Sequence, residues 1–504
     1  MPVALDLTRG QQRFLWSLLA GIVVLRLATL AAYPLPDPSE SRYAEMARKM
    51  LETGNWLVPQ FDYGTPFWGK PPLSIWLTAA AMSVFGVNEF AARLPSTLLT
   101  IGCGALVYAV AHAAAGRAAA LLCVVVYATT GLVFVGAGAV VTDPSLTFGT
   151  TLAMAGFWLA AEGPPAMRRA WGYAFFAGIA VGLLAKGPIA VVLTVFPIGA
   201  WVLWQRQWRG LGTRLPWVAG TLLVAVLVVP WYWAVERATP GFLDYFLIGE
   251  HWKRFTEPGW TGDRYGVAHA WKRGWIWLFW VAAAAPWSIV AIDWLVRVVA
   301  TPRDRVRARL ADPLFRYALC WALSPLVFFT ASGNVLITYV LPGLPAFALV
   351  LGLFGPVASE TTRALDRAEK RAFAACCVFA VALVAALVTQ HARIDREFAQ
   401  RALVRAYEAG RADPRARLVY IGDEPVSAEF YTHGKAERVA NVEALAPYFA
   451  DGHRDFFAVR DDDLARFPAG DRARLLPVAT FGTFQLLTEA PPPASSPASA
   501  PPPR

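Results

Sequence analysis

Residues 215–233 read LPWVAGTLLVAVLVVPWYW and contain no charged side chain. As a helix, a stretch of this length would rise about 28 Å, close to the roughly 30 Å hydrocarbon core of a bilayer. Similar apolar stretches recur through residues 1–390, so the sequence predicts a polytopic membrane protein. We expect eleven spans, near 14–33, 94–115, 118–138, 145–162, 171–186, 188–205, 215–233, 273–297, 317–332, 336–356 and 372–390.

The composition agrees with a membrane protein. The 504 residues are 56% hydrophobic and 16% charged, whereas globular domains are about 45–50% apolar and about 25% charged. This balance argues against a soluble enzyme, a disordered chain and a nucleic-acid-binding protein. The charge is uneven, because residues 1–390 carry 31 Lys and Arg against 20 Asp and Glu, and residues 391–504 carry 15 against 16.

Basic loops predict the orientation of the chain, because Lys and Arg concentrate in cytoplasmic loops. Every second loop of the eleven-span arrangement is basic, starting with Arg9 and Arg13 at the N-terminus. The apolar segment 72–87 is too short to span, so we interpret it as a helix at the outer surface. Segments 34–93 and 234–272 are then external, and so is the C-terminal domain.

The predicted fold is therefore an all-α polytopic membrane protein of about 11–13 transmembrane helices, followed by a small external α/β domain. We expect a catalytic membrane domain at 1–390, an α/β domain at 391–489 and a disordered Pro/Ala/Ser-rich tail at 490–504. The expected strands are Arg417–Ile421, Phe456–Val459 and Thr483–Leu487. The five cysteines lie in apolar runs and indicate neither a disulfide framework nor a metal site.

The first external loop begins PDPSESRYAEMARKMLETGNW at residues 36–56. This pattern predicts a helix, at whose start Asp37 and Glu40 could form a capping pair. The same carboxylates could instead act on a substrate. Arg42 and Lys70 are candidates for binding a phosphate, or else surface cations among lipid headgroups.

Two ionisable residues stand out in the apolar segments that follow. Asp143 lies in VVTDPSL and Lys186 lies in LLAKGPI, both at predicted external ends of helices. Charges in membrane segments are costly and often functional. The alternatives are an N-cap for Asp143 and a snorkelling cation for Lys186.

Two later external segments add further candidates. GEHWKRFTEPGW at 249–260 places His251 and Arg254 among aromatic residues, which suits a lipid phosphate, a sugar or an interfacial aromatic belt. TASGNVLITYVLPGLP at 330–345 contributes Tyr339. Glu250 and His251 are not followed by the second histidine of a zinc motif. The chain also contains no P-loop and no GxSxG motif, which argues against an ATP-driven machine and a serine hydrolase.

Six of these segments occur here in the order typical of one family: ESRYAEMARKMLETGNWLVP, GKPP, TDP, AKGP, EHWKRF and TYVLP. The sequence thereby resembles bacterial relatives of the protein O-mannosyltransferases, and in particular the lipid A aminoarabinose transferases. These are membrane glycosyltransferases of the GT-C fold. The resemblance implies a polyprenyl-phosphate sugar donor, an inverting displacement and an acceptor that is lipid A or another envelope molecule. It implies that no cofactor is required, although a divalent metal is possible. It also implies a location in the bacterial inner membrane, with the active site and the C-terminal domain on the periplasmic side.

The resemblance also assigns candidate roles. Catalytic roles would fall to Asp37 or Glu40, Lys70 and Asp143. Residues that match substrate-binding motifs of the family are Arg42, Tyr43, Lys186, His251, Arg254 and Tyr339.

Three positions depart from the aminoarabinose transferase pattern. Where those transferases have an acidic pair, this sequence has Ser39-Glu40. Where they have an acidic residue before the Lys-Pro motif, it has Gly69, and in place of a later lysine it has Val335. Loss of that cation favours a related sugar or another acceptor. A protein O-mannosyltransferase with a Ser/Thr acceptor, and a transporter or flippase of lipid-linked sugar, remain alternatives.

Overall fold

The computed structural model describes residues 7–206, 211–299, 302–355, 378–379, 381–386, 388–422 and 424–490. The chain forms two compact units. The first comprises Met1–Ala32 and Met46–Val388, and the second comprises Tyr33–Glu45 and Thr389–Arg504. Segment 33–45, the start of the predicted external loop, thus belongs with the C-terminal part of the chain.

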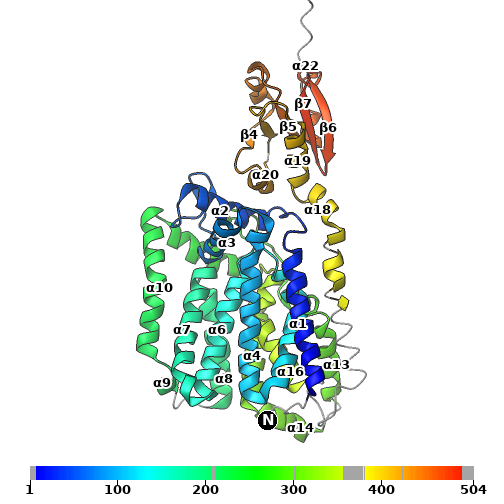
Figure 1. The fold of residues 1–504 in the computed structure, drawn as a ribbon. Coiled ribbons are helices and arrows are strands. Elements are labelled where there is room, and N and C mark those ends of the chain that lie inside the picture. Colours follow the sequence, from blue (N-terminus) through cyan, green and yellow to red (C-terminus); the bar gives the residue numbers. More distant parts are fainter. Residues whose placement is uncertain are drawn as a thin grey trace, which may run out of the picture. The chain divides into compact units, whose positions relative to one another are not determined.

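The first unit is a bundle whose long helices run side by side (Figure 1). Its main helices are α1 (Arg9–Thr29), α4 (Glu89–Ala128), α6 (Asp143–Glu162), α7 (Arg168–Lys186), α8 (Ile189–Gln205), α10 (Trp217–Ala238), α15 (Pro313–Thr330) and α16 (Leu344–Phe354). Shorter helices connect them: α3 (Leu73–Phe85), α5 (Gly131–Gly136), α9 (Leu211–Arg214), α11 (Arg254–Thr256), α12 (Trp275–Ala283), α13 (Trp287–Val299) and α14 (Arg303–Ala311). Further elements are a π-helix at Asp244–Lys253, 3₁₀ helices at Pro165–Met167 and Ile337–Gly343, and a small hairpin of β1 (Gln60–Asp62) and β2 (Thr65–Pro66).

Several of these helices are suited to a bilayer, and the chain is a membrane protein. Among the described residues, five helices are long and apolar enough to cross, and the pair α12–α13, bent by 113°, would make a sixth. The predicted count of eleven spans stays a prediction, and most of its last span, 372–390, lies outside the described residues. The predicted short helix at 72–87 is present as α3.

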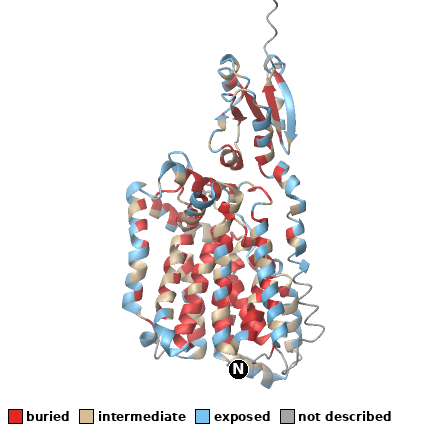
Figure 2. Ribbon diagram, viewed as in Figure 1, coloured by how far each residue is buried: buried red, intermediate tan, exposed pale blue. Residues whose placement is uncertain are grey.

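The outer face of the bundle is apolar, as a lipid-facing surface requires. Figure 2 shows the exposed side of α10. There Val218, Leu222, Val226, Val229 and Trp233 are exposed and recur every three or four residues, along one face of the helix.

Helix α4 is a tight hairpin of two helices. Gly116 has φ 80° and non-helical backbone in the middle of it. In a straight helix, residues 104 and 127 would lie about 35 Å apart. Instead, a Cβ atom added to Gly104 would contact the Tyr127 ring at 3.8 Å. The chain therefore reverses at Gly116, between the two spans predicted at 94–115 and 118–138.

Helices α6 and α7 pack backbone against backbone. A Cβ atom at Gly149 would lie 2.6 Å from the Gly182 nitrogen, and one at Gly178 would lie 2.4 Å from the Ala153 nitrogen. Small residues allow this close approach in membrane bundles. The contact joins the start of α6 to the end of α7, so it brings Asp143 and Lys186 together.

The second unit contains a five-stranded sheet in the order β4-β3-β5-β7-β6. The strands are β3 (Leu418–Ile421), β4 (Glu437–Val439), β5 (Phe456–Arg460), β6 (Leu475–Phe481) and β7 (Phe484–Glu489). Strand β3 pairs in parallel with β4 and β5, while β7 pairs antiparallel with β5 and β6. Helices α18 (His391–Glu397), α19 (Arg401–Gly410), α20 (Val426–Tyr431), α21 (Asp461–Leu464) and α22 (Ala469–Arg472) accompany the sheet.

Each face of this sheet buries its own apolar cluster. Leu418 and Tyr420 of β3 pack on one face with α19, and Val419 and Ile421 pack on the other. The three predicted strands correspond to β3, β5 and β7, and the sequence analysis missed β4 and β6. The predicted tail, beyond residue 490, lies outside the described residues.

The glycine contact between α6 and α7 predicts a specific loss of stability. Replacing Gly178 with Ala places a methyl group against the α6 backbone and should lower the free energy of unfolding by about 1–3 kcal/mol. Thermal unfolding of purified protein in detergent would measure it. Gly199→Ala is the matched control, since a Cβ atom at Gly199 meets nothing within 4 Å. Equal unfolding temperatures for the two variants would contradict the close packing.

Candidate active site

A cavity of about 390 Å³ lies within the first unit. Its apolar wall includes Leu193, Leu247, Phe255, Phe328 and Phe329. Its polar lining gathers ionisable and hydrogen-bonding side chains from distant parts of the sequence: Lys70, Asp143, Lys186, Glu250, His251, Arg254, Asn334 and Tyr339. All six candidate site residues between 70 and 339 therefore line one cavity.

Asp143 and Lys186 form an ion pair at this cavity. Asp143 is the first residue of α6 and Lys186 is the last residue of α7. Lys186 Nζ lies 2.7 Å from Asp143 Oδ1, and the side chains are only 11% and 9% exposed. The Lys186 ammonium also lies over the Tyr339 ring, 4.8 Å from its centroid. The N-cap residue of α6 is Thr142 rather than Asp143, so the capping alternative for Asp143 is wrong.

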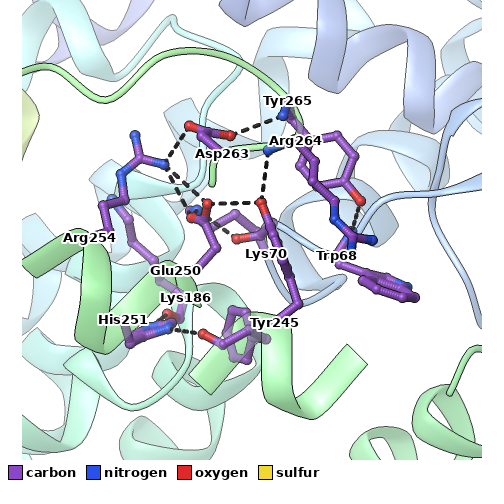
Figure 3. A network of polar contacts seen from close by, with 12 residues as sticks. Trp68, Lys70, Lys186, Tyr245, Glu250, His251, Arg254, Asp263, Arg264 and Tyr265 are labelled. Atoms are coloured by element: carbon purple, nitrogen blue, oxygen red, sulfur yellow. Dashed lines mark hydrogen bonds and ion pairs between the residues drawn. The ribbon is translucent and has the colours of Figure 1, made fainter. Parts of the chain in front are cut away.

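Glu250 binds two cations (Figure 3). Its Oε2 lies 2.8 Å from Lys70 Nζ, and its Oε1 lies 3.2 Å from Arg254 Nη1. The same Nη1 atom lies 2.9 Å from Asp263 Oδ2. Burial alone would raise the pKa of Glu250, but the charges of Lys70 and Arg254 hold that pKa below its ordinary value. Glu250 is therefore ionised, and it fixes both cations at the cavity.

The backbone before Lys70 is fixed by an aromatic clamp. The hydroxyl of Tyr265 donates to the Pro66 carbonyl at 2.8 Å and accepts from the Trp68 amide at 3.0 Å. A Cβ atom at Gly69 would lie 2.8 Å from the Phe67 ring. The glycine found where the aminoarabinose transferases have an acidic residue thus occupies a place with little room for a side chain.

Val335 also occupies an apolar place. Its side chain is 2% exposed and belongs to a cluster with Leu146, Ile276 and Val340. A lysine at this position would bury its stem and its charge among apolar groups, at a large cost unless the charge were paired. The packing here is adapted to the valine.

His251 connects two of the elements around the cavity. Its Nδ1 lies 2.8 Å from the Phe246 carbonyl oxygen, and its Nε2 lies 3.1 Å from the Lys186 carbonyl oxygen. Burial lowers the pKa of His251, and the positive charge of Lys70 acts in the same direction. The neutral ring can donate to only one of the two carbonyls at a time. His251 therefore holds the end of α7 against the π-helix.

The other four candidates, Asp37, Glu40, Arg42 and Tyr43, lie in the second unit. Helix α2 (Ser39–Thr53) begins just after Asp37. Among the described contacts, the Asp37 carboxylate accepts hydrogen bonds from Ser41 Oγ at 2.6 Å and from Ser427 rather than from an amide of α2. The predicted capping role of Asp37 is therefore wrong. Burial raises the pKa of Asp37, and the hydrogen bonds from Ser41 and Ser427 oppose that shift.

The sequence analysis did not select Glu250 and Asp263 as site residues. Both lie in quoted or adjacent external segments, next to basic residues, in GEHWKR and GDRYG. The available signal was the alternation of acidic and basic residues, which predicts local pairing but not a long-range partner. Lys70 is 180 positions from Glu250, and only the fold brings them together.

Comparisons with known proteins identify relatives of this chain. Residues 18–246 match the family model of dolichyl-phosphate-mannose-protein mannosyltransferases. The undecaprenyl phosphate-α-4-amino-4-deoxy-L-arabinose arabinosyl transferase of Shewanella sediminis is 32% identical over 332 residues, which are 65% of this chain and 57% of that protein. The crystal structure of ArnT from Cupriavidus metallidurans bound to undecaprenyl phosphate superposes with a TM-score of 0.76 at 19% identity, over 96% of this chain and 98% of that one.

The chain has the fold of ArnT, since the two structures superpose over nearly the whole of both chains. The predicted family resemblance and the predicted GT-C fold are thus confirmed. The fold extends to the archaeal oligosaccharyltransferase AglB of Archaeoglobus fulgidus, with a TM-score of 0.51 at 13% identity, over 98% of this chain and 75% of that one. The chain spans less than two thirds of the length of the curated arabinosyl transferases that it matches.

The lowered pKa of His251 predicts a dependence of stability on pH. The unfolded histidine, with a pKa of about 6.5, binds a proton more readily than the buried one, so stability should fall as the pH falls below about 6.5. At pH 5.5 this contribution is at most about 1.4 kcal/mol. His251→Asn retains one donor to a carbonyl without titrating. Thermal unfolding at pH 7.5 and 5.5 should show a smaller decrease for His251→Asn than for wild type, and equal decreases would contradict the assignment.

Proposed function

We propose that the chain is a membrane glycosyltransferase that moves a sugar from a polyprenyl-phosphate donor to lipid A or another cell-envelope acceptor. The observation that carries this proposal is the combination of the apolar cavity with Lys70, Lys186 and Arg254 in its lining. An isoprenoid chain matches the apolar wall, and a phosphate matches the cations. The names of the curated arabinosyl transferases and the undecaprenyl phosphate bound to ArnT support the same donor class.

The cations retain donors for such a phosphate. In the described part of the chain, the side-chain hydrogen bonds of Arg254 all come from Nη1, which leaves Nε and Nη2 for a ligand. Lys186 uses one described hydrogen bond, to Asp143, of the three that an ammonium can donate. The paired carboxylates hold these groups in place before the donor binds, and preorganisation of this kind is a large source of catalytic power.

The proposed reaction is an inverting displacement at the anomeric carbon of the donor sugar. The acceptor oxygen attacks this carbon, and the bond to the lipid phosphate breaks. Lys70 and Arg254 stabilise the negative charge that develops on the departing phosphate. Asp143 orients Lys186, which adds a third positive charge. No step requires a nucleotide or another cofactor.

The acceptor decides whether a general base is needed. A lipid A phosphate is already an anion and can attack directly. A hydroxyl acceptor must lose its proton, and a positioned base typically contributes about 10²–10⁴-fold to the rate of such a step. Glu40 is our candidate for that base. Because Val335 stands in place of the family lysine, the transferred sugar is either aminoarabinose or a related sugar.

We also propose that the site and the C-terminal domain face the periplasm of a bacterial inner membrane. The support is the charge pattern, in which alternate loops are basic and the site residues fall in the loops between them. The lipid-linked donor then reaches the cavity from the outer half of the bilayer.

Replacing Lys70 tests the function most simply. Lys70→Ala should lower sugar transfer at least about 100-fold, because the phosphate loses a charge-assisted contact in the transition state. The measurement is transfer from an undecaprenyl-phosphate sugar to lipid A by purified protein in detergent, followed by mass spectrometry. Lys253→Ala is the matched control, since Lys253 is exposed and does not line the cavity.

Thermal unfolding of both variants shows whether they remain folded. Near-normal transfer by folded Lys70→Ala would refute the phosphate role of Lys70. Wild-type protein that uses the donor but leaves lipid A unmodified would move the acceptor to another envelope molecule or to a protein.

A further inference from the structure

The Asp37 carboxylate joins the first turns of two helices that are far apart in the sequence. Its Oδ1 accepts hydrogen bonds from Ser41 Oγ of α2 at 2.6 Å and from the Ser427 amide of α20 at 2.9 Å. Its Oδ2 accepts a hydrogen bond from the Ser427 hydroxyl. All three residues belong to the second unit.

Further contacts fix the same segment. The Asp37 amide donates to the Phe398 carbonyl at 2.8 Å, and the Leu35 amide donates to the Tyr431 hydroxyl at 2.8 Å. Ser427 is fully buried, and its Oγ accepts a hydrogen bond from the Gln400 amide at 2.9 Å. The start of the first loop is therefore fastened to the C-terminal domain through both backbone and side chains.

This arrangement bears on the role of Asp37. A general base needs a lone pair directed at the proton that it removes. Of the roughly four acceptor positions of the Asp37 carboxylate, three accept hydrogen bonds from within the second unit, including both on Oδ1. Arg42 and Tyr43 follow Ser41 directly in α2, so a shift of this helical turn would move both candidate side chains.

We propose that Asp37 and Ser427 are positioning residues for the transfer reaction. They form a clamp through which the C-terminal domain sets the conformation of the loop segment that carries Glu40, Arg42 and Tyr43. The inference rests on the proposed function and deepens it, because it gives the C-terminal domain a part in catalysis and removes Asp37 from the candidates for the base.

The test compares Asp37→Asn with Asp37→Ala. Asparagine keeps an oxygen for the Ser427 amide and Ser41, and its amide group can donate to the second lone pair of Ser427 Oγ. It cannot act as a base. Asp37→Asn should therefore keep kcat within about 5-fold of wild type, whereas Asp37→Ala and Ser427→Ala should each lower kcat about 10-fold or more. KM for the lipid donor should change little, because Lys70, Lys186 and Arg254 are intact.

Hydrogen–deuterium exchange provides a readout that does not depend on activity. Exchange at residues 39–43 and 426–431 should match wild type in Asp37→Asn and be faster in Asp37→Ala and Ser427→Ala. Thr480→Ala is the control, since Thr480 is an exposed position of the same domain.

Two outcomes would overturn the proposal. A folded Asp37→Asn protein that loses about 10²–10⁴-fold in kcat, with exchange like wild type, would make Asp37 the base. Unchanged exchange in both Asp37→Ala and Ser427→Ala would mean that the clamp does not hold the loop. Wild-type protein without any transfer activity would refute the proposed function instead, and the exchange experiment would still decide on the clamp.

Discussion

Glu250 holds Lys70 and Arg254 at the cavity, and the geometry of the candidate site depends on this shared carboxylate. Removing one member of a buried ion pair typically costs about 3–5 kcal/mol, because the other charge is left without compensation. The fold avoids that cost by bringing the segment around Lys70 to the π-helix that carries Glu250, while Asp263 completes the surroundings of Arg254. The result is a set of cations fixed beside an apolar wall, which is the pattern that a lipid phosphate requires.

The rest of the first unit supports this arrangement through close packing. The glycines of α6 and α7 allow two backbones to touch, and the ion pair of Asp143 and Lys186 forms where these helices meet the cavity. His251 ties the last carbonyl of α7 to the neighbouring π-helix. Asp143, Lys186 and His251 are thus fixed by contacts at helix ends and with the backbone. A preorganised site requires side chains that are fixed in this way.

Much of this could be predicted from the sequence, for physical reasons that differ between elements. Long apolar stretches predict helices because a bilayer admits few other structures. The boundary between the predicted spans 94–115 and 118–138 coincides with the reversal of α4 at Gly116. Asp143 and Lys186 were detectable because charges are rare in such surroundings. The central role of Glu250 was not detectable, because its partner Lys70 lies 180 residues away and no local pattern records the pairing. The same holds for Asp37, which suits a helix cap locally but finds Ser427 through the tertiary fold.

The central claim is that the cations of this cavity bind a polyprenyl phosphate. Binding of undecaprenyl phosphate to purified protein, measured by native mass spectrometry, tests it directly. The account predicts that wild type and Arg237→Ala, whose arginine is exposed and outside the cavity, bind alike. Arg254→Ala should bind about 10–100-fold more weakly, as expected for the loss of a charge-assisted hydrogen bond. Equal binding by all three proteins, with Arg254→Ala correctly folded, would contradict the account.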